Sequence, residues 1–172
     1  NAWMLMGKAQ FYKGQFLEAA STFSYIIRLY NTNPEVMANA KIWLSRCYTE
    51  MDWFYDADNV LSKLNNDSLP SNLIPAYSAA YGNYLLRQKR FKEAVPYLQS
   101  IIKHEKKKKQ KAREYYLLGQ VYQEMGDYAK AYAAYGKVPG QNPPYELEFN
   151  ARIKQTEVVP SSNANKVIKK LR

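Results

Sequence analysis

The sequence has 172 residues, of which 47% are hydrophobic and 23% are charged, and its formal net charge at pH 7 is +10. The hydrophobic content is enough for a core, but the alternating valine-rich runs of a sheet protein are missing. No run of 18 apolar residues and no signal peptide is found, and the single Cys47 excludes an internal disulfide. These features predict a soluble, nearly all-helical segment. Because the chain begins at Asn1 within a helical pattern and without Met, we interpret it as part of a longer protein.

The first predicted helix pair occupies about residues 2–31. Small and apolar residues recur in it every three or four positions, which is the spacing of one helix face. They are Trp3, Met6, Gly7, Phe16, Ala19, Phe23 and Ile26, and Gly14 marks the turn between the helices.

Two further pairs are predicted at about residues 38–65 and 75–104. The earlier of them shows Leu44, Ser45, Tyr48, Phe54, Ala57, Leu61 and Leu64. The later one shows Tyr81, Gly82, Leu85, Phe91, Ala94, Leu98 and Ile101. The same size classes therefore return at the same places.

Helix starts and turns can also be assigned in these pairs. Asn33 and Pro34 suit an N-cap and a first-turn proline, and Pro75 suits a first turn in the next pair. Asp52 and Lys89 stand where a turn glycine is expected. We therefore expect those two turns to end their first helix in a different way.

The fourth pair, at about residues 112–139, has the clearest pattern. Its first helix shows Tyr115, Leu118, Gly119 and Tyr122, and its second shows Ala131 and Tyr135. Gly126 suits the left-handed conformation that ends a helix, and Asp127 suits the N-cap of the next one. This arrangement predicts a helix, a tight turn and a second helix.

The four pairs align with a period of about 37 residues. The small positions are Gly7, Ser45, Gly82 and Gly119 on the first helices, and Ala19, Ala57, Ala94 and Ala131 on the second; Phe23, Leu61, Leu98 and Tyr135 are large. Together with Pro143, this pattern resembles the tetratricopeptide repeat (TPR). The resemblance implies a single all-α solenoid of antiparallel helix pairs in a right-handed superhelix. Residues 144–172 are expected to be a degenerate or truncated fifth pair.

Three strings carry a more specific resemblance: AWMLMGKAQFYKGQF, RCYTEMDWFYDA and NPPYELEFNARI. They look like the large TPR lipoproteins of Bacteroidota tied to type IX protein secretion and gliding motility, the PorW/SprE kind. This resemblance implies a periplasmic scaffold attached to the outer membrane that contacts other envelope components. Any peripheral membrane association would come from parts of the protein outside this chain.

Residue types that catalyse reactions or bind metals are not grouped in the sequence. His104 is the single histidine and lies among lysines instead of beside a nucleophile. No GxGxxG or P-loop string occurs, and Asp56 and Asp58 point apart on a helix. We therefore predict a non-enzyme without catalytic residues, metal ligands or a cofactor.

A basic stretch, KHEKKKKQKAR, covers residues 103–113 and includes the run from Lys106 to Lys111. It falls where one helix pair passes into the next, so a solvated charged turn is the simplest interpretation. An acidic partner, nucleic acid or an anionic membrane surface are the alternatives. Nucleic acid is the less favoured of these, because basic and aromatic residues do not recur together in every repeat.

In TPR proteins the first helices of successive repeats line a groove that binds extended peptides or a partner's helix. By position, the groove residues implied here are Lys8, Tyr12, Arg46, Asn83, Arg87, Tyr116 and Gln120. Met4, Ile42 and Ala79 share a column with Tyr116, and Glu50 and Glu124 share one with Tyr12 and Arg87. We expect partner carboxylates to meet the cations of this set and apolar side chains to meet its tyrosines.

The leading functional hypothesis is a non-catalytic scaffold that binds a protein partner along this groove. One alternative is a basic adaptor for nucleic acid or an anionic membrane surface. Another is the TPR part of a nutrient-uptake lipoprotein. Members of that last family insert a long carbohydrate-binding region among their repeats, and this sequence has no such insertion.

Overall fold

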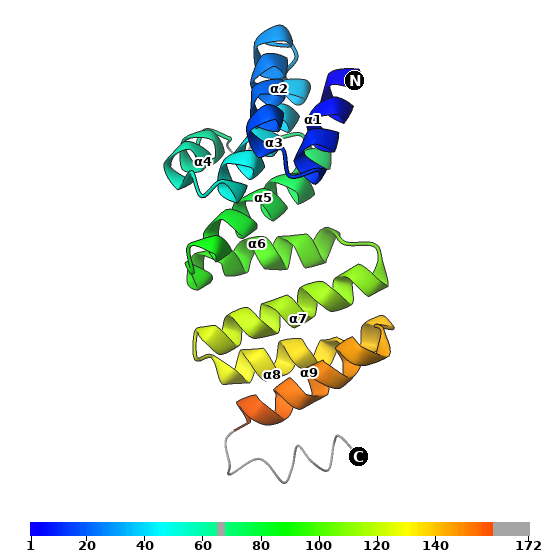
Figure 1. The fold of residues 1–172 in the computed structure, drawn as a ribbon. Coiled ribbons are helices and arrows are strands. Elements are labelled where there is room, and N and C mark those ends of the chain that lie inside the picture. Colours follow the sequence, from blue (N-terminus) through cyan, green and yellow to red (C-terminus); the bar gives the residue numbers. More distant parts are fainter. Residues whose placement is uncertain (65–67, 160–172) are drawn as a thin grey trace. The chain divides into compact units, whose positions relative to one another are not determined.

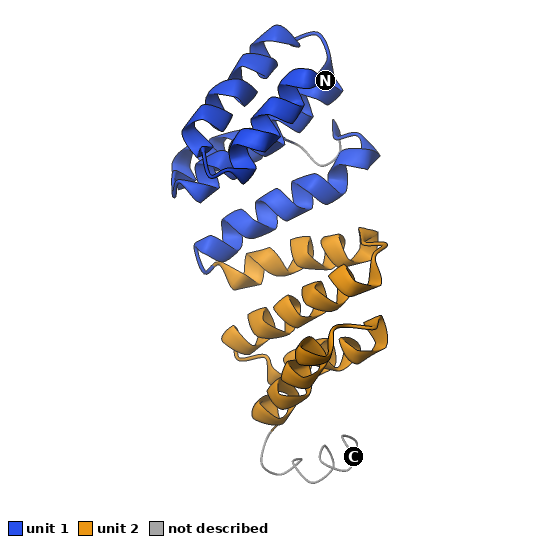
Figure 2. Cartoon of the chain, turned by 45° about the vertical axis from the view of Figure 1, so that its right-hand side comes forward, with its two compact units in different colours: residues 1–89 blue, residues 90–172 orange. Residues whose placement is uncertain are grey.

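The computed structural model describes residues 1–64 and 68–159. Within these ranges every regular element is a helix, as Figure 1 shows, so the predicted all-α fold is confirmed. The chain divides into two compact units, which Figure 2 colours separately. Unit 1 is Asn1–Lys89 and unit 2 is Arg90–Arg172.

The described residues of unit 1 form consecutive helices. They are α1 (Ala2–Tyr12), α2 (Phe16–Leu29), α3 (Pro34–Glu50), α4 (Phe54–Leu61), the 3-10 turn η2 (Ser71–Leu73) and α5 (Ile74–Arg87). Helix α2 packs against α1 and α3, and α3 packs against α4 and α5. The first two helix pairs are therefore α1–α2 and α3–α4.

Unit 2 continues with α6 (Phe91–His104), α7 (Lys108–Glu124), α8 (Tyr128–Lys137), the 3-10 turn η3 (Pro139–Gln141) and α9 (Tyr145–Val158). Helix α7 packs against α6 and α8, and α9 packs against α8 (Figure 1). The pair α7–α8 is the fourth predicted pair, and α9 begins the predicted fifth. The rest of that fifth pair, residues 160–172, lies outside the described residues. Because the unit boundary falls between α5 and α6, one continuous array over residues 1–172 stays a prediction.

Local sequence sets the helix starts. The side chain of Asn33 accepts a hydrogen bond from the backbone N–H of Val36 at 3.2 Å, and Pro34 occupies the first turn of α3. Asp127 accepts in the same way from the N–H of Lys130 at 3.3 Å, at the start of α8. Each bond satisfies an N–H group that has no partner inside the helix, which stabilises the helix by about 1 kcal/mol.

The four turns that follow α1, α3, α5 and α7 each contain a residue in the left-handed conformation. Gly14 and Gly126 have φ angles of 79° and 76°. Asp52 and Lys89 have φ angles of 57° at the equivalent places. The expectation that these two turns end differently is therefore wrong: they keep the glycine geometry, and their side chains make it strained.

The repeat positions are buried as the spacing predicts. Ala19, Ala57, Ala94 and Ala131 are 0% exposed, and Gly7, Ser45, Gly82, Gly119, Phe23, Leu61, Leu98 and Tyr135 are also buried. A Cβ atom at Gly7 would lie 2.7 Å from the ring of Phe23, and one at Gly119 would lie 2.6 Å from the ring of Tyr135. Neither glycine has room for a side chain, which confirms the register within these pairs.

The single cysteine, Cys47, lies on α3 in the core of unit 1. It is 0% exposed, and this burial raises the pKa of its thiol to about 12 although the charge of Arg46 acts in the opposite direction. The reactive thiolate is therefore not populated near neutral pH.

Two glutamates lie close together where α6 passes into α7. Atom Oε2 of Glu114 is buried, and no hydrogen-bond partner for it exists among the described residues. This burial raises the pKa of Glu114 to about 7, and the negative charge of Glu105 is a further cause. Below that pH the Glu114 carboxyl group holds a proton, which relieves the repulsion between the two groups.

We expect Ala131→Leu to lower the free energy of unfolding by about 1–3 kcal/mol, because the added side chain overpacks a site without space. Ala129→Leu, on the exposed side of α8, is the matched control and should leave the free energy of unfolding within about 0.5 kcal/mol of the native value. Thermal melts followed by circular dichroism measure both variants. An unchanged midpoint for Ala131→Leu would contradict the helix register.

Replacing Lys89 by Gly should raise the free energy of unfolding by about 1 kcal/mol, because glycine adopts the left-handed conformation without steric cost. The reverse change, Gly126→Lys, should lower it by a similar amount at the equivalent turn. Urea unfolding curves provide the measurement. A loss of stability in Lys89→Gly would show that its side chain makes a contact worth more than the strain.

Because of the raised pKa of Glu114, we expect the free energy of unfolding to fall as the pH rises from about 4.5 to about 7. In this window the unfolded chain releases the Glu114 proton while the folded chain retains it, so a rising pH favours unfolding. Glu114→Gln removes this contribution, and its stability relative to the native chain should increase between pH 5 and pH 8. Melting midpoints across this range provide the test, with Glu124→Gln, an exposed position on α7, as the control. If the melting midpoints of the native chain and of Glu114→Gln change in parallel with pH, the pKa of Glu114 is not raised in the folded chain.

Candidate partner-binding site

An aromatic cluster centred on Trp43 of α3 joins the first three helices of unit 1. Phe11 and Tyr12 of α1 meet Trp43 edge-on, with ring centroids 5.4 and 5.9 Å away, and Phe23 of α2 stacks on it at 5.9 Å. Phe11 and Trp43 are buried, whereas Tyr12 is 72% exposed. The cluster is therefore a buried aromatic base with one exposed ring at its edge.

Two of the predicted groove cations lie on this base. The Arg46 guanidinium carbon is 4.2 Å from the Trp43 ring centroid and 4.9 Å from that of Phe11, and Nζ of Lys8 is 5.2 Å from the Trp43 centroid. Cation–π contacts at these distances stabilise an exposed cation by about 0.5–1 kcal/mol each. The structure thus brings Lys8, Tyr12 and Arg46 together, and we call these three residues with Phe11 and Trp43 the Arg46 surface.

Arg87 of α5 differs from the prediction, because its guanidinium group is already paired. Its Nη1 atom lies 3.1 Å from Oε2 of Glu50, and its Nη2 atom lies 3.3 Å from Oδ1 of Asp52. These contacts connect α5 to the end of α3 and to the turn that follows it. A partner carboxylate would have to displace Glu50, so Arg87 is not a free donor for a ligand.

One column of the predicted groove belongs partly to the core. Met4 and Ile42 are 7% and 1% exposed, so the prediction that they line a groove is wrong. Ala79 of the same column is exposed on α5. Asn83, one turn further along α5, is half-buried. The α1 and α3 positions of this column pack between helices instead of facing a ligand.

The remaining two predicted residues lie on α7 of unit 2. Gln120 is exposed, but Tyr116 is partly buried, with its ring centroid 5.5 Å from that of Tyr135. Tyr116 also packs against the small buried cluster between α7 and α9. Its contacts therefore hold helices of unit 2 together, which differs from the free groove ring that we expected.

The sequence reasoning missed one residue of this region, Trp43, although a signal for it existed. Trp43 precedes Arg46 by three positions, and residues three apart lie on the same face of a helix. Glu50 was expected in one groove column with Arg87, but the ion pair between them was not predicted. Glu50 precedes Arg87 by 37 positions, the repeat period, so their opposite charges stand at equivalent places on neighbouring first helices.

The lysine run lies at the start of α7, where Lys106–Lys109 are exposed. The first turn of α7 contains no acidic residue. Positive charge at the N-terminus of a helix opposes the helix dipole, so these lysines do not stabilise α7. Their exposure fits a solvated turn, and a binding role for them stays a prediction.

Within residues 1–64 and 68–159, no group of three or more His, Cys, Asp or Glu side chains is arranged to hold a metal ion. The helices of the same ranges are too short or too polar to cross a membrane. His104 is exposed, with Nδ1 2.8 Å from the backbone oxygen of Ser100. A chain without enzymatic activity or cofactor therefore stays a prediction.

Comparisons with known proteins agree with this architecture. The family profile of the tetratricopeptide repeat matches residues 112–138, which lie in α7 and α8. No curated protein matches the chain. A crystal structure of the MamA protein is 21% identical with a TM-score of 0.70, and the match covers 98% of this chain and 85% of that one. The structure of MamA 41-end from Desulfovibrio magneticus RS-1 is 18% identical with a TM-score of 0.69, and the match covers 98% and 88%. At these identities the likeness concerns the fold, and the chain therefore contains a tetratricopeptide repeat at residues 112–138 and has the TPR fold.

Proposed function

We propose that the chain is a protein-binding scaffold and that a partner docks on the Arg46 surface of unit 1. The observation that supports this most directly is the position of Arg46, whose charged group lies against Trp43 and Phe11. A TPR fold offers such side chains on packed helices, which suits the recognition of another protein.

The Arg46 surface is preorganised for an acidic ligand. Two aromatic rings hold the guanidinium group, so less side-chain entropy is lost when a carboxylate binds. Lys8 adds a second cation on the same Trp43 ring, and the exposed ring of Tyr12 offers apolar area beside them. Arginine and aromatic residues of this kind dominate the binding energy of many protein interfaces.

The neighbouring pair of Arg87 and Glu50 limits where the acidic group of a partner can bind. Because Glu50 occupies Arg87 at 3.1 Å, the net positive charge of this region lies at Lys8 and Arg46. A partner carboxylate would gain two charged hydrogen bonds there without displacing an existing pair. The α5 end of the region can contribute polar contacts through Asn83.

The cellular setting of this scaffold is a further part of the proposal. We place it in the periplasm, within the type IX secretion and gliding machinery of Bacteroidota, with an envelope protein as partner. The three strings quoted above support this setting through their resemblance to the PorW/SprE lipoproteins. A lipoprotein signal at the N-terminus of the full-length gene product would be its distinguishing mark.

Arg46→Glu should release a specific partner, because it replaces the cation at the centre of the surface by a repelling charge. Quantitative mass spectrometry of proteins captured from a lysate of the source organism identifies what the native chain retains and the variant loses. The affinity for that purified partner should fall by at least about 10-fold, as expected for a lost charged hydrogen bond.

Arg28→Glu changes an exposed residue of α2 and reverses the same charge in unit 1, so it is the matched control. Circular dichroism verifies that both variants are folded. If the native chain, Arg46→Glu and Arg28→Glu capture the same proteins in the same amounts, the Arg46 surface is not the binding site.

A further inference from the structure

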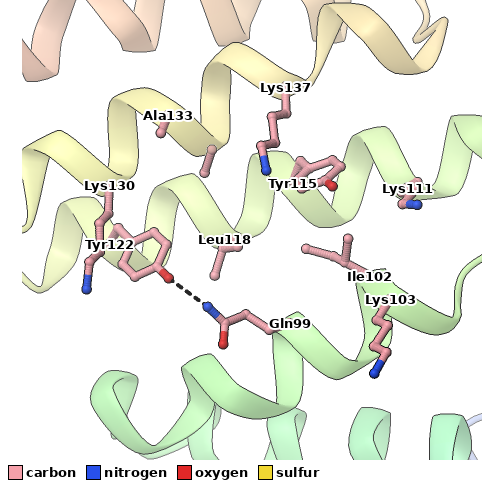
Figure 3. Close-up of a pocket in the computed structure, with 11 residues that line it drawn as sticks. Gln99, Ile102, Lys103, Lys111, Tyr115, Leu118, Tyr122, Lys130, Ala133 and Lys137 are labelled. Carbon is pink, nitrogen blue, oxygen red and sulfur yellow. Dashed lines mark hydrogen bonds between the residues drawn. The ribbon is translucent and has the colours of Figure 1, made fainter.

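A second surface, built within unit 2, does not include any of the predicted groove residues. It is a pocket of about 500 Å³ between α6, α7 and α8 (Figure 3). This volume is within the range of known ligand sites in proteins. Neither Tyr116 nor Gln120 lines it, so it is separate from the groove that the sequence predicts.

The base of this pocket is apolar. Ile102 of α6 and Leu118 of α7 lie at its centre, and Ala133 of α8 adds a small side chain (Figure 3). Ile102 and Leu118 are 6% exposed, so they belong to the packing of the helices, and Ala133 is exposed. An apolar side chain from outside would therefore meet hydrocarbon at the bottom of the pocket.

Four lysines surround this base, and no carboxylate lines the pocket. Lys103 comes from α6, Lys111 from α7, and Lys130 and Lys137 from α8 (Figure 3). Of the four, Lys130 alone takes part in an ion pair among the described residues, with Asp127 at 3.6 Å. The rim of the pocket therefore carries a clear excess of positive charge.

Aromatic rings position two of these cations. Nζ of Lys137 is 5.4 Å from the Tyr115 ring centroid, and Nζ of Lys130 is 5.8 Å from that of Tyr122. The Tyr122 hydroxyl in turn accepts a hydrogen bond from Nε2 of Gln99 at 3.2 Å (Figure 3). The charged groups thus lie along the tyrosine rings at the edges of the pocket, and its apolar base stays accessible.

We propose that this pocket, which we call the lysine pocket, binds an acidic peptide segment of a partner protein that inserts one large apolar side chain. The apolar base receives that side chain, and aspartate or glutamate residues on either side pair with the rim lysines. This contact is independent of the Arg46 surface, so either can exist without the other.

Charge decides between the possible occupants of the lysine pocket. Residues 161–172 of this chain include three lysines and one arginine and no acidic residue, so they would be repelled. A second copy of the chain, with a formal net charge of +10, is disfavoured for the same reason. Nucleic acid and anionic lipid bind basic surfaces through their phosphate groups and would leave the hydrocarbon base of this open pocket without a partner, whereas a peptide can fill it with an apolar side chain.

The test uses the whole chain and a phage library of random 12-residue peptides. Peptides enriched on the native chain should combine a large apolar residue with neighbouring Asp or Glu. Two variants then remove the two halves of the site. The triple change Lys103→Gln, Lys130→Gln, Lys137→Gln neutralises the rim, and Ala133→Trp fills the pocket without changing its charge. Each should lower the affinity of the enriched peptides by about 10-fold or more, as measured by fluorescence polarisation.

The matched control is Lys106→Gln, Lys107→Gln, Lys109→Gln, which removes the same number of charges from the exposed run outside the pocket. It should change the affinity of the peptides by less than about 2-fold. Circular dichroism verifies the fold of each variant, and Ala133→Trp tests the site even if the rim triple is unfolded.

Three results would overturn the proposal. The first is a library without enriched acidic and apolar sequences. The second is enriched peptides that bind Ala133→Trp as tightly as the native chain. The third comes from two other probes, fluorescein-labelled oligothymidine and phosphatidylglycerol vesicles. The proposal fails if these probes bind the native chain and peptides do not. In that case the two triple variants would lower the affinity of the probes equally, Ala133→Trp would leave it unchanged, and the surface would be a general basic patch.

Discussion

The rest of this structure depends on contacts in which a large side chain of one helix packs against a glycine of the partner helix. In two helix pairs an aromatic ring lies directly on a glycine of the partner helix, Phe23 on Gly7 and Tyr135 on Gly119. Such a contact fixes both the separation of the two helices and their rotation about their axes. The hydroxyl group of Tyr135 also donates a hydrogen bond to Gln123 at 2.8 Å, which holds the ring in place. Once these contacts are set, the outward face of each helix is determined.

Both proposed binding surfaces rely on one further arrangement, a cation lying along an aromatic ring. Arg46 does so on Trp43 in unit 1, and Lys137 does so on Tyr115 in unit 2. The ring removes part of the freedom of a long side chain and leaves its charge facing solvent. The chain has 16 tyrosines, and some serve the packing of the helices, as Tyr135 does, while others position charges, as Tyr115 does.

The repeat pattern predicted the fold because a core depends on the size of each side chain, and size can be read from a single sequence. The alanines and glycines at equivalent positions proved buried, and so did the large residues that recur with them. The pairing of Arg87 with Glu50 was not predicted, because it joins two first helices and needs their lateral spacing. The lysine pocket was missed for the same reason: its lysines come from three helices, and no single segment of the sequence places them together.

The geometry at Asp52 and Lys89 shows a different limit. Sequence preferences assign left-handed turns to glycine, but two turns of this chain adopt that conformation with Asp52 and Lys89 at the turn position. Local preference is therefore a weaker predictor than the repeat when the two disagree.

The buried thiol of Cys47 gives this chain a built-in chemical reporter. It is the single cysteine, it lies on α3 in the core of unit 1, and it is 0% exposed with its pKa raised to about 12. An alkylating reagent can reach it after α3 separates from its neighbours. The rate of alkylation therefore measures how often unit 1 opens, while unit 2, which has no cysteine, stays silent in the same experiment. The stability of one half of the chain can thus be followed without adding a label to it.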